Sequence, residues 1–290
     1  MYDSVFMSSF GSNIYETLGS LETNREQLKN TVIWNSVGSA SLIIFFKILG
    51  FTFLQTLEYL KSFELSHTFV NGYFIIPEDQ DSKIQYIRDW LIEKIEINNL
   101  ISKETTLGEI FKLTNIFPNF VVWSRNEGKL ISLNPKFFPD ITLVDSILST
   151  FSCIGTFVEF KINHDIFSSY FCGDFYPISE NFSLNNKQLN TLYIAHHSEY
   201  FFGDIIEDSP FSYIENEVMK QFIECNNSRI KNVNLDNILI IYDDIYKNSL
   251  TDVKKDFCFE NGKNQAQNFI DGFSNYDYYK LKKLEIKNQK

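Results

Sequence analysis

The sequence is poor in arginine, and it has no basic segment ahead of its last residues. Only four of its 26 basic residues are arginines, and 37 acidic residues give a formal net charge of −11. A protein that binds nucleic acid through the phosphates needs a basic surface. The sequence therefore argues against a nucleic-acid partner, and its charge also argues against docking on anionic lipid by attraction alone.

Cysteines are few and widely spaced. The four are Cys153, Cys172, Cys225 and Cys258, with no CxxC pair and no His-Cys spacing. The sequence thus predicts neither a zinc site nor a disulfide framework, and we expect no metal and no cofactor. Reduced thiols, together with an N-terminus that lacks a cationic region ahead of an apolar stretch, favour an intracellular, cytoplasmic protein without a signal peptide.

A membrane-spanning run is not apparent. One uncharged run, Asn30–Phe46, approaches the length of a span, but it contains several serines and asparagines and is closed by Lys47. A buried strand, turn and helix explain this composition better, so we expect no transmembrane segment. The scarcity of arginine beside abundant lysine, asparagine, isoleucine and phenylalanine suggests an AT-rich coding genome, such as that of a large DNA virus.

The most informative stretch that is present runs from Leu28 to Phe46. It is typical of a short strand at Thr31–Trp34, a turn that carries Ser36 and Gly38, and a buried helix that begins near residues 39–41. A sharp strand-to-helix turn of this kind, spelled G-x-S-x-G, presents a nucleophilic serine in many hydrolases. Here the second glycine is Gly38, but Trp34 stands in place of the first.

The periodicity around this stretch alternates strands and helices. A short strand at Ser4–Met7 precedes a helix at Ile14–Leu21, whose apolar residues follow the i, i+4, i+7 spacing of a helix that faces a core. Later, a strongly β-forming strand at Asn237–Asp243 precedes a closing helix at Asp252–Ile270. This alternation predicts an α/β fold with helices on both faces of a mostly parallel sheet.

No linker divides the chain convincingly. We expect one domain over residues 1–275, with a cap segment around residues 64–115, followed by a basic C-terminal tail over residues 276–290. Further expected elements are a helix at Ile84–Asn98, a capping box at Thr106–Glu109, a hairpin around Arg125–Gly128, a strand at Gly155–Lys161 and a helix at Phe211–Cys225.

A series of motifs in a fixed order carries a family likeness. The motifs are Ser8–Ile14 after the first strand, Trp34–Ser39 at the turn, Pro139–Asp145, and Tyr170–Asp174. The series resembles the patatin-like phospholipases, which are lipid acyl hydrolases that use a Ser-Asp dyad. The resemblance spans most of the chain, and it implies a three-layer α/β/α fold with a mostly parallel central sheet.

The glycine-rich oxyanion loop of that family falls on Ser9, Phe10, Gly11 and Ser12. In an active member the loop supplies backbone N–H groups to the oxyanion, and its glycines adopt positive φ angles. Here Ser9 and Phe10 replace two of the glycines, and Asn13 stands at the cationic position. The resemblance therefore implies a degenerate anion site that is distorted or filled by the Phe10 ring.

The residue that would activate the nucleophile is also changed. In the family, the aspartate of a D-G-G/A motif accepts the serine proton. Cys172 stands at this position and cannot act as a carboxylate base, and Asp174, two residues later, would replace it only if the loop shifted register. No histidine falls on a family motif, and we expect His196 and His197 in a solvated loop.

These departures leave Ser36 as a vestigial nucleophile, which we interpret as structural, and Trp34 is expected to fill the space of an acyl chain. The leading hypothesis is a pseudoenzyme that keeps the fold as a binding, assembly or structural module, with a lipid or a protein as its partner. The alternative is an active phospholipase A-type acyl hydrolase with a rearranged dyad of Ser36 and Asp174. A third hypothesis is a structural subunit of a larger particle.

Overall fold

The structure is a computed structural model. It describes residues 1–9, 11–63, 77–151, 160–162, 165–169, 190–201, 224, 237–246 and 250–288, and the statements that follow concern these residues.

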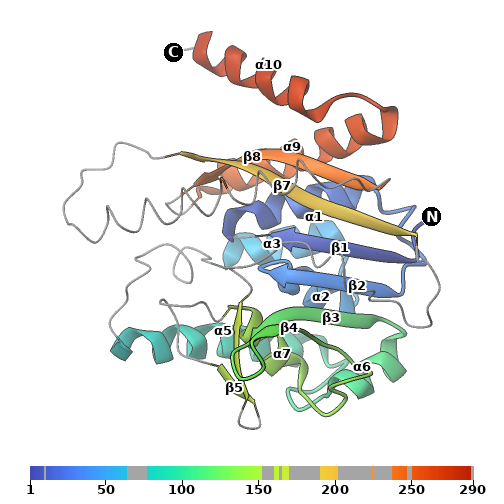
Figure 1. Cartoon of the computed structure of the whole chain (residues 1–290), viewed down its shortest axis with the longest axis vertical. Coiled ribbons are helices and arrows are strands. Elements are labelled where there is room, and N and C mark those ends of the chain that lie inside the picture. The colour runs from blue at the N-terminus through green and yellow to red at the C-terminus, as the bar shows by residue number, and fades with distance from the viewer. Residues whose placement is uncertain are drawn as a thin grey trace.

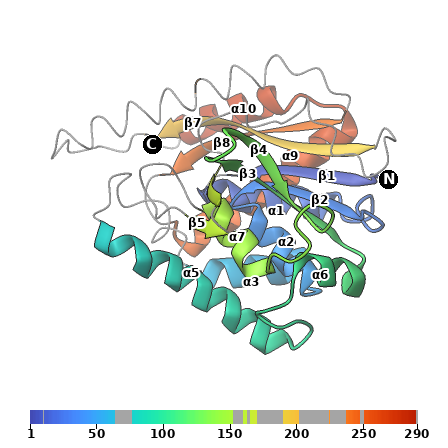
Figure 2. The same ribbon diagram turned by 60° about the horizontal axis from the view of Figure 1, so that its bottom comes forward.

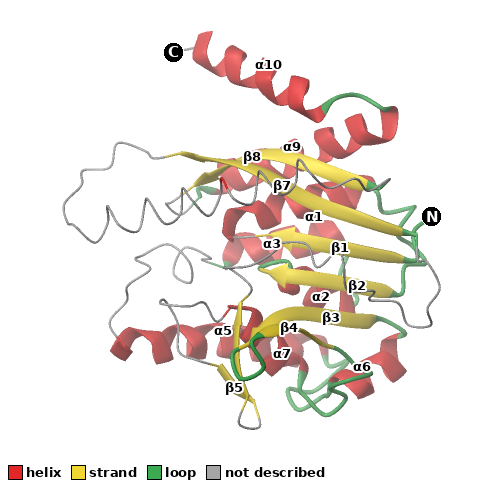
Figure 3. Cartoon of the chain, in the orientation of Figure 1, coloured by secondary structure: helices red, strands yellow, loops and turns green. Residues whose placement is uncertain are grey.

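One mixed sheet organises the fold (Figures 1 and 3). Its order is β5-β6-β3-β2-β1-β7-β8, and β4 pairs with β3 beside this path. The strands are β1 (Ser4–Ser9), β2 (Ile33–Gly38), β3 (Phe117–Ser124), β4 (Lys129–Leu133), β5 (Phe160–Ile162), β6 (Asp165–Ser169), β7 (Thr191–Phe201) and β8 (Ile238–Tyr246). The pairings from β3 through β2, β1 and β7 to β8 are parallel, and the others are antiparallel. The carboxyl ends of the parallel strands therefore meet at one edge, toward which the arrowheads of β1 and β2 point in Figure 3.

Helices cover the sheet. They are the short 3-10 helix η1 (Gly11–Asn13), then α1 (Ile14–Thr23), α2 (Ser41–Ile48), α3 (Phe53–Ser62), α5 (Pro77–Asn98), α6 (Leu107–Thr114), α7 (Leu143–Phe151), α9 (Asp252–Asp271) and α10 (Asn275–Asn288). Figure 2 shows α1, α2, α3 and α7 on one face of the sheet, with α5 running outside them. The predicted α/β fold with a mostly parallel sheet flanked by helices is confirmed.

The core divides along the two faces of the sheet. The larger cluster joins side chains of β1 and β2, such as Val5, Met7 and Trp34, to apolar side chains of α1, α2, α7 and α9. A smaller cluster on the other face is built around Phe6, Val37, Val121 and Ala195. Central parallel strands bury both faces, which explains why every residue of β1 and of β2 is buried.

Helices from opposite ends of the chain cross closely. A Cβ atom on Gly19 of α1 would lie 2.0 Å from the carbonyl oxygen of Phe259 in α9, and a Cβ atom on Gly262 would lie 2.0 Å from that of Glu16. Neither position has room for a side chain. The two glycines therefore let the backbones of α1 and α9 touch.

Three buried asparagines, from β2, from β3 and from the residue after β4, are linked by hydrogen bonds. Asn119 Nδ2 donates to Asn35 Oδ1 at 2.7 Å, and Asn134 Nδ2 donates to Asn119 Oδ1 at 3.1 Å. Asn35 Nδ2 in turn donates to Ser4 Oγ and to the Val5 carbonyl, each at 2.9 Å. Buried amides that are hydrogen-bonded in this way fix the register of β1, β2 and β3.

Local predictions are confirmed at two places, and one predicted strand has other bounds. Thr106 and Glu109 form the predicted capping box of α6, and the β3–β4 hairpin turns at Gly128, which has a φ of 61°. The strand predicted at Thr31–Trp34 instead covers Ile33–Gly38. The segment expected as a basic tail forms α10, and its Tyr279 is buried.

Other expected elements are covered only in part. Residues 152–159 and the predicted helix at Phe211–Cys225, apart from position 224, lie outside the described residues, while the strand predicted at Gly155–Lys161 has its described part in β5. In the expected cap segment, α5 packs on the helical layer, because Trp90 stacks on Phe63 with ring centroids 4.1 Å apart. The division into domain, cap and tail stays a prediction.

Candidate functional site

The connection from β2 to α2 is where a nucleophile would stand in a hydrolase of this fold. The strand ends at Gly38, which has a φ of 63°, and the helix begins three residues later at Ser41. A Cβ atom on Gly38 would lie 2.5 Å from the carbonyl oxygen of Ser9. The strained position of this turn therefore excludes any side chain, a serine included.

Ser36 lies in the strand and not in the turn, which corrects its predicted position. Its register partners are Met7 of β1 and Phe120 of β3, and its exposed fraction is 0%. Side chains alternate along a strand, so Ser36 points to the same face as Trp34, which belongs to the larger core cluster. Ser36 Oγ is buried and has no hydrogen-bond partner among the described residues. The hydroxyl is thus enclosed in the core, two residues before the turn.

The segment after β1 closes over the turn. The Ser39 N–H donates to the Ser9 carbonyl at 3.2 Å, the hydroxyls of Ser9 and Ser39 lie 3.0 Å apart, and Ser39 Oγ donates to the Gly11 carbonyl at 3.4 Å. Gly11 has a φ of 55°, and Ser12 follows it in η1. The segment after β1 is therefore hydrogen-bonded to the connection between β2 and α2.

Helix α7 contacts the same turn through Thr150. Thr150 Oγ1 lies 2.8 Å from Ser41 Oγ and 3.3 Å from the Gly38 carbonyl oxygen. Asp145, which belongs to the Pro139–Asp145 motif, forms an ion pair with Arg88 of α5 at 3.1 Å. These contacts make the turn a packed junction of β1, β2 and α7.

Trp34 is a core side chain near the start of β2. Its exposed fraction is 0%, its indole N–H donates to the Thr31 carbonyl at 3.0 Å, and its ring packs against Phe53. Lys47 Nζ lies over the Trp34 ring, 5.5 Å from the centroid, and burial lowers the pKa of this lysine. Whether the ring takes the space of an acyl chain stays a prediction.

Three of the predicted site residues cannot be placed. Phe10, Cys172 and Asp174 lie outside the described residues. The oxyanion-loop role of Phe10, the loss of the base at Cys172 and the replacement base at Asp174 therefore stay predictions.

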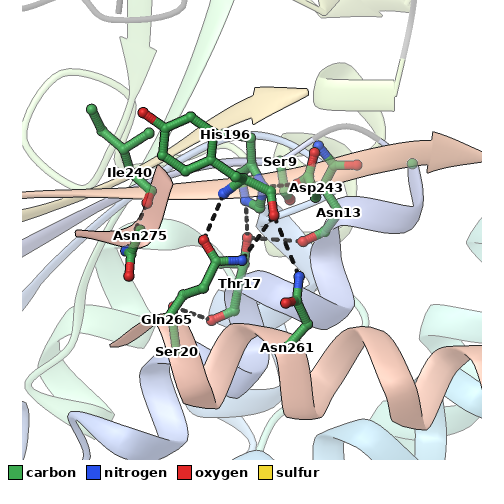
Figure 4. A network of polar contacts seen from close by, with 12 residues as sticks. Ser9, Asn13, Thr17, Ser20, His196, Ile240, Asp243, Asn261, Gln265 and Asn275 are labelled. Carbon is green, nitrogen blue, oxygen red and sulfur yellow. Dashed lines mark hydrogen bonds and ion pairs between the residues drawn. The ribbon is translucent and has the colours of Figure 1, made fainter. Parts of the chain in front are cut away.

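A polar series that joins the middle of β7 and of β8 to α1 was not predicted from the sequence (Figure 4). His196, expected in a solvated loop, lies in β7 and is only 4% exposed. Its Nδ1 forms a buried hydrogen bond with Asp243 Oδ2 of β8, and its Nε2 lies 2.8 Å from Thr17 Oγ1. The alternation of Leu192, Ile194 and His196 along a strand was the pattern that could have revealed the buried position.

This series has the order of a carboxylate, an imidazole and a hydroxyl, as in a Ser-His-Asp triad. The Thr17 hydroxyl, however, donates to the Asn13 carbonyl at 3.1 Å, inside the first turns of α1, and Thr17 has an exposed fraction of 0%. A hydroxyl that is buried in this way is not accessible to a substrate. The three side chains instead connect α1 to β7 and β8.

The fold is similar to that of solved bacterial protein structures. VipD from Legionella pneumophila matches with a TM-score of 0.57 and 14% identity, over 93% of this chain and 67% of VipD. The chain has a patatin-like fold. At this identity the likeness concerns the fold alone.

Further matches to this patatin-like fold are weaker. The type III effector ExoU matches with a TM-score of 0.43 and 9% identity, over 91% of this chain and 52% of ExoU. ExoU in complex with SpcU from Pseudomonas aeruginosa matches with a TM-score of 0.48 and 10% identity, over 92% of this chain and 52% of ExoU. The chain thus spans about half the length of ExoU. No protein-family description and no curated protein matches the sequence.

Neither a metal-binding group nor a membrane-spanning helix is found in the described part of the chain. No group of three or more His, Cys, Asp or Glu side chains there is arranged to hold a metal ion. No helix among those residues is both long and apolar enough to cross a membrane.

Proposed function

We propose that this chain is a catalytically degenerate patatin-like protein, a pseudoenzyme that keeps the fold as a binding, assembly or structural module. The observation that carries the proposal is the turn after β2. Gly38 occupies its strained position, and a side chain there would meet the Ser9 carbonyl oxygen at 2.5 Å. A nucleophile elbow needs a serine at such a turn.

The position of Ser36 supports the same proposal. Its hydroxyl is buried on the face of the sheet that carries Trp34, with an exposed fraction of 0%. A general base must come within about 2.6–3.2 Å of the proton that it accepts, and no described acidic side chain forms a hydrogen bond to Ser36 Oγ. The alternative, an active lipid acyl hydrolase that uses Ser36 and Asp174, requires this strand to open.

The closed segment after β1 supplies a third argument. The loss of one oxyanion donor costs a hydrolase about 100- to 1000-fold in rate. Here the Ser39 N–H, at the start of α2, is already bonded to the Ser9 carbonyl. The proposal includes a partner for this module, which is a lipid or a protein inside the cell.

The test is labelling of the full chain with a fluorophosphonate probe, beside a fluorogenic ester assay. An active patatin-like phospholipase serves as the positive control, and Ser36→Ala and Ser39→Ala serve as matched variants. We expect no labelling of the wild-type chain and no turnover above the buffer rate. Labelling or turnover that disappears in Ser36→Ala would overturn the proposal in favour of the hydrolase, and loss in Ser39→Ala alone would move the nucleophile to Ser39.

A further inference from the structure

Strand β8 forms one edge of the sheet among the described strands. An edge strand presents unpaired backbone N–H and C=O groups, and another strand can add to them. The residues at its start, Ile238–Tyr242, read ILIIY, which is apolar, uncharged and rich in β-branched side chains. Segments of this kind pair readily with a copy of themselves when they are exposed.

A glutamine of α9 pairs with the edge as a strand would. Gln265 Oε1 accepts the backbone N–H of Tyr242 at 2.8 Å, and its Nε2 donates to the carbonyl of the same residue at 2.8 Å. Gln265 has an exposed fraction of 0%. A primary amide is well suited to this role, since it offers one acceptor and one donor side by side.

Two further amides extend the cover. Asn261 Nδ2 of α9 donates to the Tyr242 carbonyl at 3.4 Å, and Asn275 Nδ2, at the start of α10, donates to the Ile240 carbonyl at 2.9 Å. Figure 4 shows these side chains beside β8. The rings of Tyr276 and Tyr279 in α10 also pack on the Tyr242 ring, with centroids 5.4 and 5.9 Å away.

We propose that Asn261, Gln265 and Asn275 form an edge cover that prevents a second copy of this chain from adding its own β8 to the sheet. A second copy is the matching partner because two identical edges pair antiparallel about a twofold axis. Apolar side chains at these positions would shield the edge but leave the Tyr242 N–H and C=O without partners, which is costly in a buried place. The amides satisfy these groups and occupy the directions along which a strand would approach.

Hydrogen exchange of the wild-type chain provides the first test, read out by NMR at single amides. The Tyr242 N–H should exchange as slowly as amides of the central strands β1 and β2, although it points outward from an edge strand. Exchange at the rate of an exposed loop would overturn the proposal. A wild-type chain that already associates through β8 would also overturn it.

Variants provide the second test. Gln265→Ala combined with Asn275→Ala should speed exchange of the Tyr242 amide by at least about tenfold, and should shift the mass in light scattering from one chain toward two or more as the protein concentration rises. Gln267→Ala is the matched control, because Gln267 lies on the same helix, is exposed and, among the described residues, forms its side-chain hydrogen bonds with Asp271 of α9.

The outcomes are distinct. Unchanged exchange at Tyr242 in the folded double variant contradicts the edge cover, and faster exchange in a chain that stays monomeric contradicts the role of the second copy. If the double variant does not fold, the wild-type exchange rate decides. None of these results depends on catalytic activity, so they do not bear on the pseudoenzyme proposal.

Discussion

Replacing Gly38 by alanine tests the closed turn directly. The added Cβ would lie 2.5 Å from the Ser9 carbonyl oxygen, whereas ordinary contacts are 3.4–4 Å. The backbone of β1 or of β2 must therefore move by about 1 Å, and the bond from the Ser39 N–H to the Ser9 carbonyl is stretched. We expect Gly38→Ala to destabilise the fold strongly.

Four contributions set the size of the effect. A left-handed backbone costs a residue other than glycine about 1–2 kcal/mol, while the loss of chain freedom in the unfolded state returns about 0.4–1 kcal/mol. Overpacking in a closed site costs a further 1–3 kcal/mol or so, and the weakened hydrogen bond costs about 0.5–1.5 kcal/mol. The sum is a loss of roughly 1.5–6 kcal/mol in the free energy of unfolding.

The chain offers a matched control in Gly50→Ala. Gly50 has a φ of 81°, and an added Cβ meets nothing within 4 Å. This variant carries the backbone cost alone, about 0–1.5 kcal/mol, and the difference between the two variants in urea unfolding isolates the contact with Ser9. Equal losses would refute the reasoning, because they would mean that the segment after β1 moves freely and that the turn can open.

Three further predictions rest on buried polar groups, each read out by urea unfolding. Ser36→Ala should leave the free energy of unfolding unchanged or raise it by up to about 1 kcal/mol, because the hydroxyl is buried without a partner; a clear loss would indicate an unseen bond. His196→Ala should cost about 1–3 kcal/mol, because Asp243 Oδ2 stays buried without the imidazole that is hydrogen-bonded to it, and an unchanged free energy of unfolding would contradict this contact. Burial lowers the pKa of Lys47 in the folded chain, so the unfolded chain binds more protons in the alkaline range below the ordinary lysine pKa of 10.5, and wild-type stability should rise with pH there. Lys47→Met should abolish that rise, and an identical pH profile in both proteins would contradict the assignment.

The fold class could be predicted from the sequence, because strand and helix periods alternate and both faces of the central strands are apolar. The residue at which β2 ends could not be predicted. Asn35 looks like the end of an apolar strand, yet its amide is satisfied by Ser4 and Asn119 from two neighbouring strands. Contacts between residues 31 and 84 positions apart decide the matter, and no local pattern records them.

The candidate site was predictable in part for a similar reason. The altered G-x-S-x-G motif indicated where the turn lies. That Gly38 is the strained residue of this turn is shown only by its positive φ and by the close approach of Ser9, which depend on three-dimensional packing. The pairing of His196 with Asp243 joins residues 47 positions apart. A histidine next to another histidine suggests a polar loop, and only the strand register shows it to be buried.

The crossing of α1 and α9 has a consequence for how the chain folds. Thr23 and Lys263 are hydrogen-bonded across 240 positions of sequence, and Gly19 and Gly262 bring the same two helices into backbone contact. Contacts of such high sequence separation close large loops and slow folding. During synthesis α1 lacks its packing partner until α9 has been made, and the apolar residues of α1 stay exposed in the meantime. Between these two events the nascent chain depends on chaperones or risks aggregation. Substitutions at the two glycines should therefore lower the yield of folded protein more than they lower its equilibrium stability.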